Sequence, residues 1–216
     1  MTHTLFDLAA LGPRDVYKLL IGSVVPRPIA WVTTRSPEGR FNAAPYSFFN
    51  CLSADPPILA LGVENHADMS FKDTAHNIRH TEEFTVNIVD AANLDAMNVT
   101  AVAFPSGVDE LQEAGLTPVA GSKVACPRIA EAPISIECRR HITLEVGRSR
   151  EIILGMGLAI HVRADLVDAR HHIDQTALNA VGRMGGHGYA VASDVFDLKT
   201  MSPEDYALAQ PRREAV

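Results

Sequence analysis

The feature that most constrains the fold of this chain is a series of short apolar runs rich in β-branched residues, which favour strands. The runs lie at residues 29–34, 57–63, 84–89, 134–146 and 151–167. Gly155 and Gly157 fall inside the last run, where they are suited to ease a bend. Because strands outnumber helices and do not alternate with them regularly, a doubly wound parallel sheet is disfavoured. The pattern predicts a mainly β protein with helices, in which a few helices cover the ends of a closed antiparallel barrel.

Turn and helix signals complete this outline. The segment Ser36-Pro37-Glu38-Gly39 has proline and glycine at the second and fourth positions, as in a type I turn. The first run and the strand that resumes at Arg40 are therefore predicted to form a hairpin. Helical spacing, or proline and glycine at the expected ends, marks four further segments. These are residues 13–22, 69–80, 91–103 and 109–115.

The composition is that of an ordinary globular domain. A length of 216 residues fits a single domain over residues 1–216, from which only the charged, proline-bearing tail at 203–216 stands apart. With 47% hydrophobic and 21% charged residues, the chain is unlike a disordered segment or a disulfide-stapled miniprotein. No apolar run approaches the roughly 18–20 residues that cross a bilayer. A net charge of −7 without a basic stripe argues against nucleic acid as a partner.

The cysteines and the first residues bear on the compartment. Three cysteines, an odd number with no Cys-x-x-Cys pair, fit reduced thiols. The first residues show no basic region followed by an apolar one, the pattern of a secretory signal. We therefore expect a cytoplasmic protein with no membrane partner.

Familiar catalytic and metal-binding patterns are missing from the sequence. It contains no His-Glu-x-x-His or Cys/His array, no Gly-x-Ser-x-Gly elbow and no phosphate-binding loop of the Walker type. Gly155-Met156-Gly157 lacks the third glycine of a dinucleotide fingerprint and lies inside a predicted strand, so bending is favoured over phosphate binding. We expect neither a metal centre nor a dedicated catalytic side chain.

The most unusual segment is residues 42–50. It begins with small polar residues, bends at Pro45 and continues with aromatic side chains and hydrogen-bonding groups. A planar heterocycle needs such a site, because small residues allow close approach and aromatic residues form a wall. The alternative is the end of a strand that packs Phe48 and Phe49 into the core.

Two other segments carry a weaker signal. Residues 71–74 begin a predicted helix with a lysine and a threonine, which suits a phosphate, unless Ser70 or Asp73 merely caps the helix. Residues 183–189 hold three glycines between an arginine and a tyrosine. That composition suits backbone close to a flat or charged ligand, or else a flexible surface loop.

The order and spacing of these segments resemble the flavin reductase-like, FMN-binding split-barrel family, especially its branch of flavoredoxin-like proteins and stand-alone reductases. The resemblance extends from about residue 16 to residue 189. It implies a split antiparallel β-barrel that forms a homodimer, with FMN at the subunit interface. The matching segments are residues 26–34, 42–50, 55–57, 72–74, 83–87 and 182–186.

The resemblance also implies which residues contact the cofactor. In the family, the matching strands line the ring and ribityl chain, the helix start lies near the phosphate, and the glycine-rich loop approaches the flavin or the dimer partner. The implied cofactor-binding residues are Arg27, Trp31, Val32, Thr33, Thr34, Asn42, Ala43, Ala44, Pro45, Tyr46, Ser47, Phe48, Phe49, Lys72, Asp73, Thr74 and Arg183. One departure concerns the nicotinamide site, where many reductases carry a histidine and this chain reads Arg148-Ser149-Arg150.

The resemblance therefore implies an FMN-dependent NAD(P)H:flavin oxidoreductase. Hydride from NADH or NADPH would reach FMN, and electrons would pass to a monooxygenase or another acceptor protein. The cofactor performs this chemistry, so the absence of an acid–base dyad is no objection. Two alternatives remain open: an FMN-containing electron carrier of flavoredoxin type without a nicotinamide site, and a non-enzymatic flavin-binding module.

Overall fold

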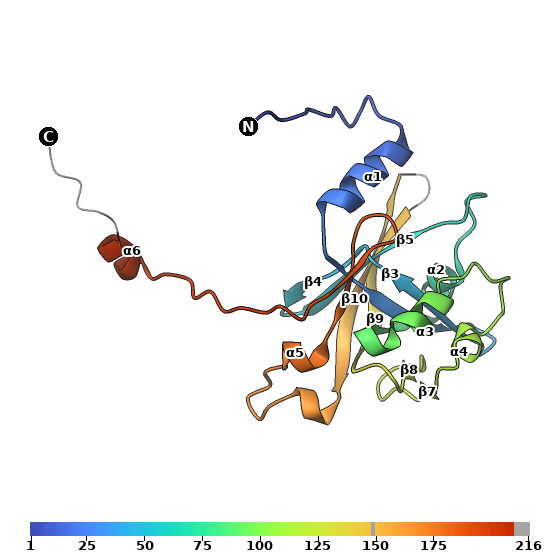
Figure 1. Ribbon diagram of the computed structural model, residues 1–216. Coiled ribbons are helices and arrows are strands. Elements are labelled where there is room, and N and C mark those ends of the chain that lie inside the picture. Colours follow the sequence, from blue (N-terminus) through green and yellow to red (C-terminus); the bar gives the residue numbers. More distant parts are fainter. Residues whose placement is uncertain (148–149, 210–216) are drawn as a thin grey trace, which may run out of the picture.

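The computed structural model describes residues 1–147 and 150–209 and is built around one antiparallel sheet of seven strands (Figure 1). The strand order is β3-β2-β6-β9-β10-β5-β4, and β3 also approaches β5, so the sheet curls into a split antiparallel β-barrel. The predicted fold class is thereby confirmed. Smaller sheets, β1-β11-β12 and β7-β8, flank the barrel.

The strands and helices occupy defined residue ranges. The strands are β1 Arg27–Pro28, β2 Ala30–Arg35, β3 Phe41–Tyr46, β4 Phe49–Ala54, β5 Pro57–Glu64, β6 Glu83–Ile88, β7 Pro118–Val119, β8 Arg128–Ile129, β9 Ile134–Val146, β10 Arg150–Val162, β11 Val181–Arg183 and β12 Tyr189–Val191. The helices are α1 Pro13–Ser23, α2 Asp73–Thr81, η1 Ala91–Asn93, α3 Leu94–Val99, α4 Glu110–Glu113, η2 Ala164–Leu166, α5 Gln175–Leu178 and α6 Pro203–Ala209. None of these described helices has the length and apolar character needed to span a membrane.

Strand β2 is buried on both of its faces. Successive side chains of a strand point to opposite sides. Ala30 and Val32 belong to a core cluster that includes Ile78 of α2. Trp31 belongs to a second cluster, beneath α3 and α4, that includes Met97. The strand thus forms a wall between two cores, and its side chains are committed to packing.

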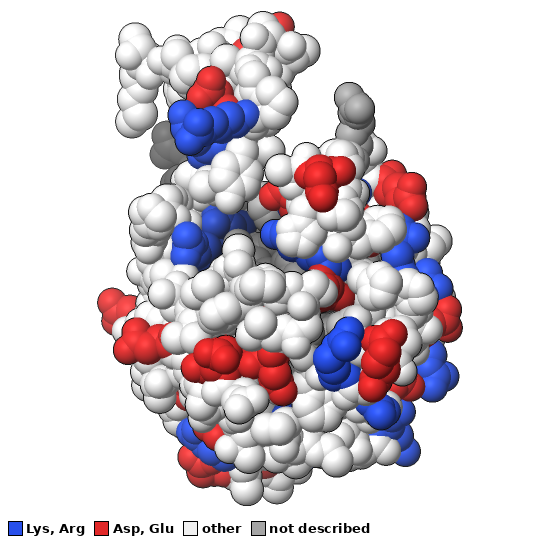
Figure 2. Space-filling model, turned by 90° about the vertical axis from the view of Figure 1, so that its right-hand side faces the viewer, with Lys and Arg blue, Asp and Glu red and all other residues white. Residues whose placement is uncertain are grey.

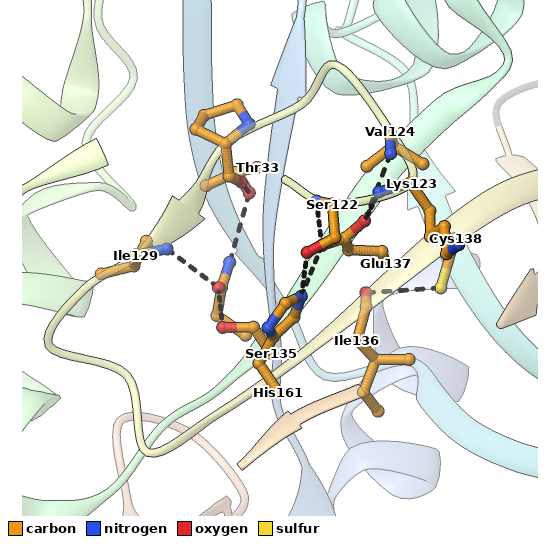
Figure 3. A network of polar contacts seen from close by, with 12 residues as sticks. Thr33, Ser122, Lys123, Val124, Ile129, Ser135, Ile136, Glu137, Cys138 and His161 are labelled. Atoms are coloured by element: carbon orange, nitrogen blue, oxygen red, sulfur yellow. Dashed lines mark hydrogen bonds and ion pairs between the residues drawn. The ribbon is translucent and has the colours of Figure 1, made fainter. Parts of the chain in front are cut away.

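A buried amide holds β2 against its neighbours (Figure 3). The Asn87 side chain on β6 donates to the Trp31 carbonyl at 2.9 Å and to the Thr33 hydroxyl at 3.2 Å. Its oxygen accepts the Ile129 N–H at 3.1 Å and the Ser135 hydroxyl at 2.8 Å. Because donor and acceptor are both satisfied, the polar group is tolerated in the interior and ties together β2, β6, β8 and β9.

A buried carboxylate anchors a neighbouring loop in the same region (Figure 3). Glu137 on β9 accepts the backbone N–H groups of Ser122, Lys123 and Val124 and contacts the His161 ring. Burial acts to raise the pKa of Glu137, but the hydrogen bonds from the loop and from His161 outweigh it and leave the pKa lowered. The carboxylate is therefore a structural anchor that holds the loop at residues 122–124 against β9.

Most of the predicted strands are confirmed. Residues 29–34, 57–63, 84–89 and 134–146 correspond to β2, β5, β6 and β9. The Gly39 N–H donates to the Ser36 carbonyl at 2.9 Å, and β2 pairs with β3, so the predicted hairpin is confirmed.

The last long strand is shorter than the predicted 151–167. It ends at Val162, because the chain then turns into η2, where the Leu166 N–H donates to the Arg163 carbonyl at 3.0 Å. The predicted bend is present, since the pairing register of β10 shifts between Leu154 and Gly155. A side chain at Gly155 would collide with the Phe84 ring.

Helix α1 lies where it is predicted, α4 occupies the middle of the predicted 109–115, and two further helices start late or end early. The segment 69–80 becomes helical only at Asp73, because the Asp68 carboxylate accepts the N–H and hydroxyl of Ser70 and folds that stretch into a turn. The segment 91–103 ends its helix at Val99, where the Thr100 hydroxyl donates to the carbonyl of Met97. In the predicted tail, residues 203–209 form α6 and residues 210–216 lie outside the described residues.

Candidate functional site

A groove runs along β3 and opens on the side of the molecule that carries α2, α3 and α4. Figure 2 faces that side and shows a hollow bordered by basic side chains. One part of the groove has a volume of about 430 Å³, within the range typical of small-molecule sites. Its walls come from β3, the start of α2 and the loop after α3. The lining residues are Asn42, Ala44, Pro45, Tyr46, Asn65, His66, Ala67, Lys72, Asp73, Thr74, Thr100, Ala101, Val102, Ala103, Phe104, Ser106 and Glu110.

The amino terminus of α2 faces this cavity, and no side chain among the described residues caps it. Lys72 is the residue before the helix and makes no cap hydrogen bond. Ser70 bonds to Asp68, and the Asp73 carboxylate accepts the Ser106 hydroxyl at 2.9 Å, so neither caps the helix. The self-capping alternative is therefore wrong. Free N–H groups, the helix dipole and a lysine together favour an anion here.

The floor of the cavity is polar, and some of its polar groups form hydrogen bonds with each other or with the backbone. The Asn42 amide donates to the Thr74 hydroxyl at 3.0 Å, and the Glu110 carboxylate accepts the Ala43 N–H at 3.0 Å. Burial raises the pKa of Tyr46 to about 12, an effect that its bond with Thr74 opposes. Burial also raises the pKa of Glu110.

One acceptor in the cavity wall has no partner among the described residues. The side-chain oxygen of Asn65 is buried and accepts no hydrogen bond. An unpaired buried acceptor costs roughly 1–3 kcal/mol, which a ligand hydroxyl can recover. The cavity therefore presents both an end whose charge favours an anion and an acceptor suited to a hydroxyl group.

The groove continues into a second part, of about 220 Å³, that shares Pro45, Tyr46 and Ala101 with the first. Aromatic and basic side chains dominate this end. The Arg183 guanidinium lies 4.5 Å from the centre of the Tyr189 ring, and its NH2 group donates to the Gly186 carbonyl at 2.7 Å. The lining residues are Tyr17, Ile21, Arg27, Ile29, Pro45, Tyr46, Ser47, Met97, Ala101, Arg183, Gly186 and Tyr189.

Arg27 braces this second part. Its buried guanidinium donates to the carbonyls of Ile21 at 2.6 Å, Val24 at 2.9 Å and Met184 at 3.1 Å. Burial, together with the nearby charge of Arg183, lowers the pKa of Arg27. Most of its donors are thus spent on holding the end of α1 and the glycine-rich loop in place.

The structure brings many of the sequence-predicted residues to the groove. They are Arg27, Asn42, Ala44, Pro45, Tyr46, Ser47, Lys72, Asp73, Thr74 and Arg183. Five others are buried in β2 and β3 and do not line it: Trp31, Val32, Thr33, Thr34 and Ala43. Their side chains contact the cores and α2. They affect the groove only indirectly, because they fix the position of β3.

The two phenylalanines belong to a different cavity, of about 460 Å³, beneath α1. Phe49 packs against the core of the barrel, as expected if residues 42–50 include the end of a strand that packs its phenylalanines inward. Phe48 is more exposed, and the Arg150 guanidinium lies 4.6 Å from the centre of its ring. At residues 148–150 the sequence departs from the family pattern; Arg148 and Ser149 lie outside the described residues.

Sequence reasoning misses part of the groove. The loop at residues 100–106 forms one wall, and Asn65, Glu110 and Tyr17 also line it. The sequence pattern places the start of this loop in a longer helix, and no motif marks the isolated polar residues. Only the folded arrangement places them opposite β3.

The fold and the groove together define a class of protein: a small split barrel with an elongated groove, one end of which has the lysine and helix terminus that suit an anion and the other an aromatic wall. Residues 21–177 match the family model described as "Flavin reductase like domain". The chain therefore belongs to the flavin reductase-like family, and the resemblance noted from the sequence is confirmed.

Similar proteins agree with this assignment. An uncharacterized protein of Deinococcus radiodurans is 48% identical over 205 residues, which cover 92% of this chain and 90% of that protein. The crystal structure of nitrilotriacetate monooxygenase component B from Bacillus cereus is 32% identical, covers 92% of this chain and all of that one, and has a TM-score of 0.88. The structure of Pseudomonas fluorescens 2-nitrobenzoate 2-nitroreductase NbaA is 32% identical, covers 93% and 98%, and has a TM-score of 0.85.

Proposed function

We propose that this protein is an FMN-binding oxidoreductase that takes hydride from NADH or NADPH. The observation that carries the proposal is the groove along β3, with an uncapped helix terminus and Lys72 at one end and an aromatic, basic wall at the other. These ends suit the phosphate and the ring of a flavin mononucleotide. Membership of the flavin reductase-like family supports the same ligand.

The residues of the groove fit such a cofactor. Lys72 and the free N–H groups at the start of α2 would hold the phosphate. The unpaired Asn65 oxygen would accept from a hydroxyl of the ribityl chain. Pro45, Tyr46 and Ser47 would flank the ring. We assign no phosphate contact to the Asp73 carboxylate, because it has the wrong charge and already accepts from Ser106.

FMN, when bound, supplies the group that accepts a hydride and passes electrons onward. The task of the protein is to bind and orient it. Arg183, fixed by Gly186 and stacked on Tyr189, places a positive charge at the ring end, which favours negative charge on a bound ligand. In an acidic protein, this local charge has to overcome a net charge of −7.

We further propose that the electrons go to an acceptor outside this chain. One similar structure is a component of a monooxygenase, and its name supports a monooxygenase partner. Another is a nitroreductase, and its name supports a small-molecule acceptor. The three free cysteines suit a reducing compartment, which supports a cytoplasmic location.

We also propose that the protein is a homodimer. The outer face of β9 exposes Ile142, Leu144 and Val146 to 44%, 46% and 46%. These residues recur at every second position of one strand, so they lie on one face. An apolar sheet face of this kind is typical of a surface that a second chain covers.

The decisive experiment mixes FMN-loaded protein with NADH or NADPH under anaerobic conditions and follows the yellow flavin absorbance. Bleaching at a rate well above that of free FMN with the same nicotinamide supports the reductase. Loaded protein that stays yellow until a separate reductase is added would favour the flavoredoxin-type carrier. A protein that neither purifies with FMN nor quenches the fluorescence of added FMN would overturn flavin binding itself.

A further inference from the structure

The C-terminal arm, residues 192–209, leaves the barrel after β12 and points away from it (Figure 1). The Ala192 N–H donates to the Ala180 carbonyl at 2.9 Å. Beyond that bond, the hydrogen bonds of the described arm residues are internal, around Ser202 and Asp205 at the start of α6. Within the described residues, the arm therefore has no hydrogen-bond partner on the barrel after its first residue.

Large apolar side chains on this arm are exposed. Phe196, Leu198 and Leu208 are 82%, 85% and 86% exposed. Segments that stay free in water are usually poor in such residues, because covering apolar surface is worth about 25 cal/mol per Å². Phe196 and Leu198 lie two positions apart, with Asp197 between them, in a stretch that is neither helix nor strand; if that stretch packed as a strand, both would point to one side. The exposed apolar residues also include Val195, Met201 and Tyr206.

A groove of matching character lies between β4, β5, β9 and β10. We call it the apolar groove; its volume is about 350 Å³. β4 is an edge strand that exposes Leu52, and Ile160, which lines the groove, is exposed as well. An edge strand with uncovered apolar surface is usually shielded by another segment. The apolar groove is lined by Cys51, Ser53, Pro57, Ile58, Leu59, Ile136, Gly157, Leu158, Ala159 and Ile160.

We propose that the arm crosses to a second copy of this chain and packs Phe196 and Leu198 into the apolar groove of that copy. In Figure 1 the arm leaves the barrel on the side of β4, opposite α2, α3 and α4, and extends beyond the barrel. Fully extended, residues 192–202 would span about 35 Å, roughly the width of a small domain. It is therefore long enough to lie across a neighbouring barrel.

The arm of a second copy of this chain is the partner that we propose for the apolar groove. Every chain carries both the apolar arm and the apolar groove, so a twofold axis allows two arms to exchange and forms the contact twice. Packed as a strand, the arm would turn Asp197 and Lys199 to the side opposite Phe196 and Leu198, where they would remain in water. Because the arm starts at β12, whose Tyr189 lines the candidate site, an arm held by a second copy also fixes that wall. The inference rests on the self-association proposed above and does not depend on flavin binding.

Cross-linking tests where the arm lies. Cys51 is an exposed free thiol that lines the apolar groove, whereas Cys126 and Cys138 are buried. In the full-length chain, Leu198→Cys treated with a short bis-maleimide should give a two-chain product joined through residue 51. The product should vanish when Cys51→Ser is added. Arg14→Cys, an exposed control on α1, should give far less of it. A product within one chain, or two-chain linkage equal to that of the control, would overturn the proposal.

The dissociation constant of the dimer tests how much the arm contributes to self-association. The double variant Phe196→Ser/Leu198→Ser should raise the dimer dissociation constant at least tenfold, as measured by light scattering on serial dilutions. Asp197→Ser/Lys199→Ser changes the charged side chains of the same stretch and should leave the constant within twofold. Equal dissociation constants for both variants would contradict arm exchange, but they would not contradict the proposed dimer. A wild-type chain that is monomeric at every concentration would contradict both, while the FMN titration would still test the flavin proposal separately.

Discussion

Strands β2 and β3 are neighbours in the sheet, and the sequence resemblance covers both, yet the structure uses them differently. Trp31 pairs with Pro45 and Val32 pairs with Ala44. β2 has a strand on each side and a core on each face, so its residues 30–34 are buried. β3 is an edge strand, and one of its faces lines the groove.

This difference shows that a segment shared with a family can reflect packing as well as binding. The side chains of β2 hold the barrel wall in place, and those of β3 meet whatever occupies the groove. Substitutions in β2 should therefore change the free energy of unfolding, and substitutions on the groove face of β3 should change the affinity for FMN. Variants of the two strands and of the groove around them test this division, starting with the largest expected effect.

Trp31→Ala should lower the free energy of unfolding by about 3–5 kcal/mol, because it opens a cavity in a fully buried core. It also leaves the Thr100 hydroxyl without the indole donor that lies 2.9 Å away. Urea denaturation checks the value. The milder Trp31→Phe keeps most of the packing and should bind FMN within twofold of wild type. If Trp31→Phe abolished FMN binding while remaining folded, β2 would contact the cofactor and the division would fail.

Ala44→Leu should weaken FMN binding at least a hundredfold, about 2.8 kcal/mol. Ala44 lines the cavity, so the larger leucine side chain would occupy space that the ligand needs. Its stability should fall much less than that of Trp31→Ala. Quenching of FMN fluorescence measures the affinity. Ala54→Leu, an exposed site at the end of β4, is the matched control and should bind normally. Full affinity in Ala44→Leu would place the cofactor away from β3.

Lys72→Ala should weaken FMN binding by about 1–3 kcal/mol, the value of a charge-assisted contact with phosphate. The affinity for riboflavin, which lacks the phosphate, should not change. Lys123→Ala removes an exposed lysine that does not line the groove and serves as the control. Equal losses for FMN and riboflavin would argue against a phosphate at the start of α2.

Local sequence signals predict the barrel well and the groove only in part. β-branched runs and the turn at Gly39 define strands because those preferences act within a few residues. The wall at residues 100–106 depends on Thr100 bonding to both Trp31 and Met97, and the first of these contacts joins segments 69 positions apart, which no local pattern contains. The burial of Trp31 is likewise set by the second core. Its aromatic character fits either a ligand wall or a core, and only the packing of α3 decides between them.

Glu110→Gln should give the smallest effect, and it tests whether the groove floor beside β3 carries a charge. Burial raises the pKa of Glu110 above its usual value of 4.5, so the folded state holds this proton more tightly than the unfolded state. The wild-type protein therefore loses stability as the pH rises from about 4.5 through that raised pKa. The amide oxygen of the introduced glutamine would still accept the Ala43 N–H, but the amide has no proton to release in this range.

The Glu110→Gln variant should thus gain stability relative to wild type over that pH interval, as measured by urea denaturation at a series of pH values. It should also bind FMN roughly threefold more tightly at neutral pH, because a like charge is removed from the groove. Glu113→Gln, exposed on the same helix, should do neither. Parallel pH profiles for wild type and Glu110→Gln would show that the floor of the groove is not a buried titrating site.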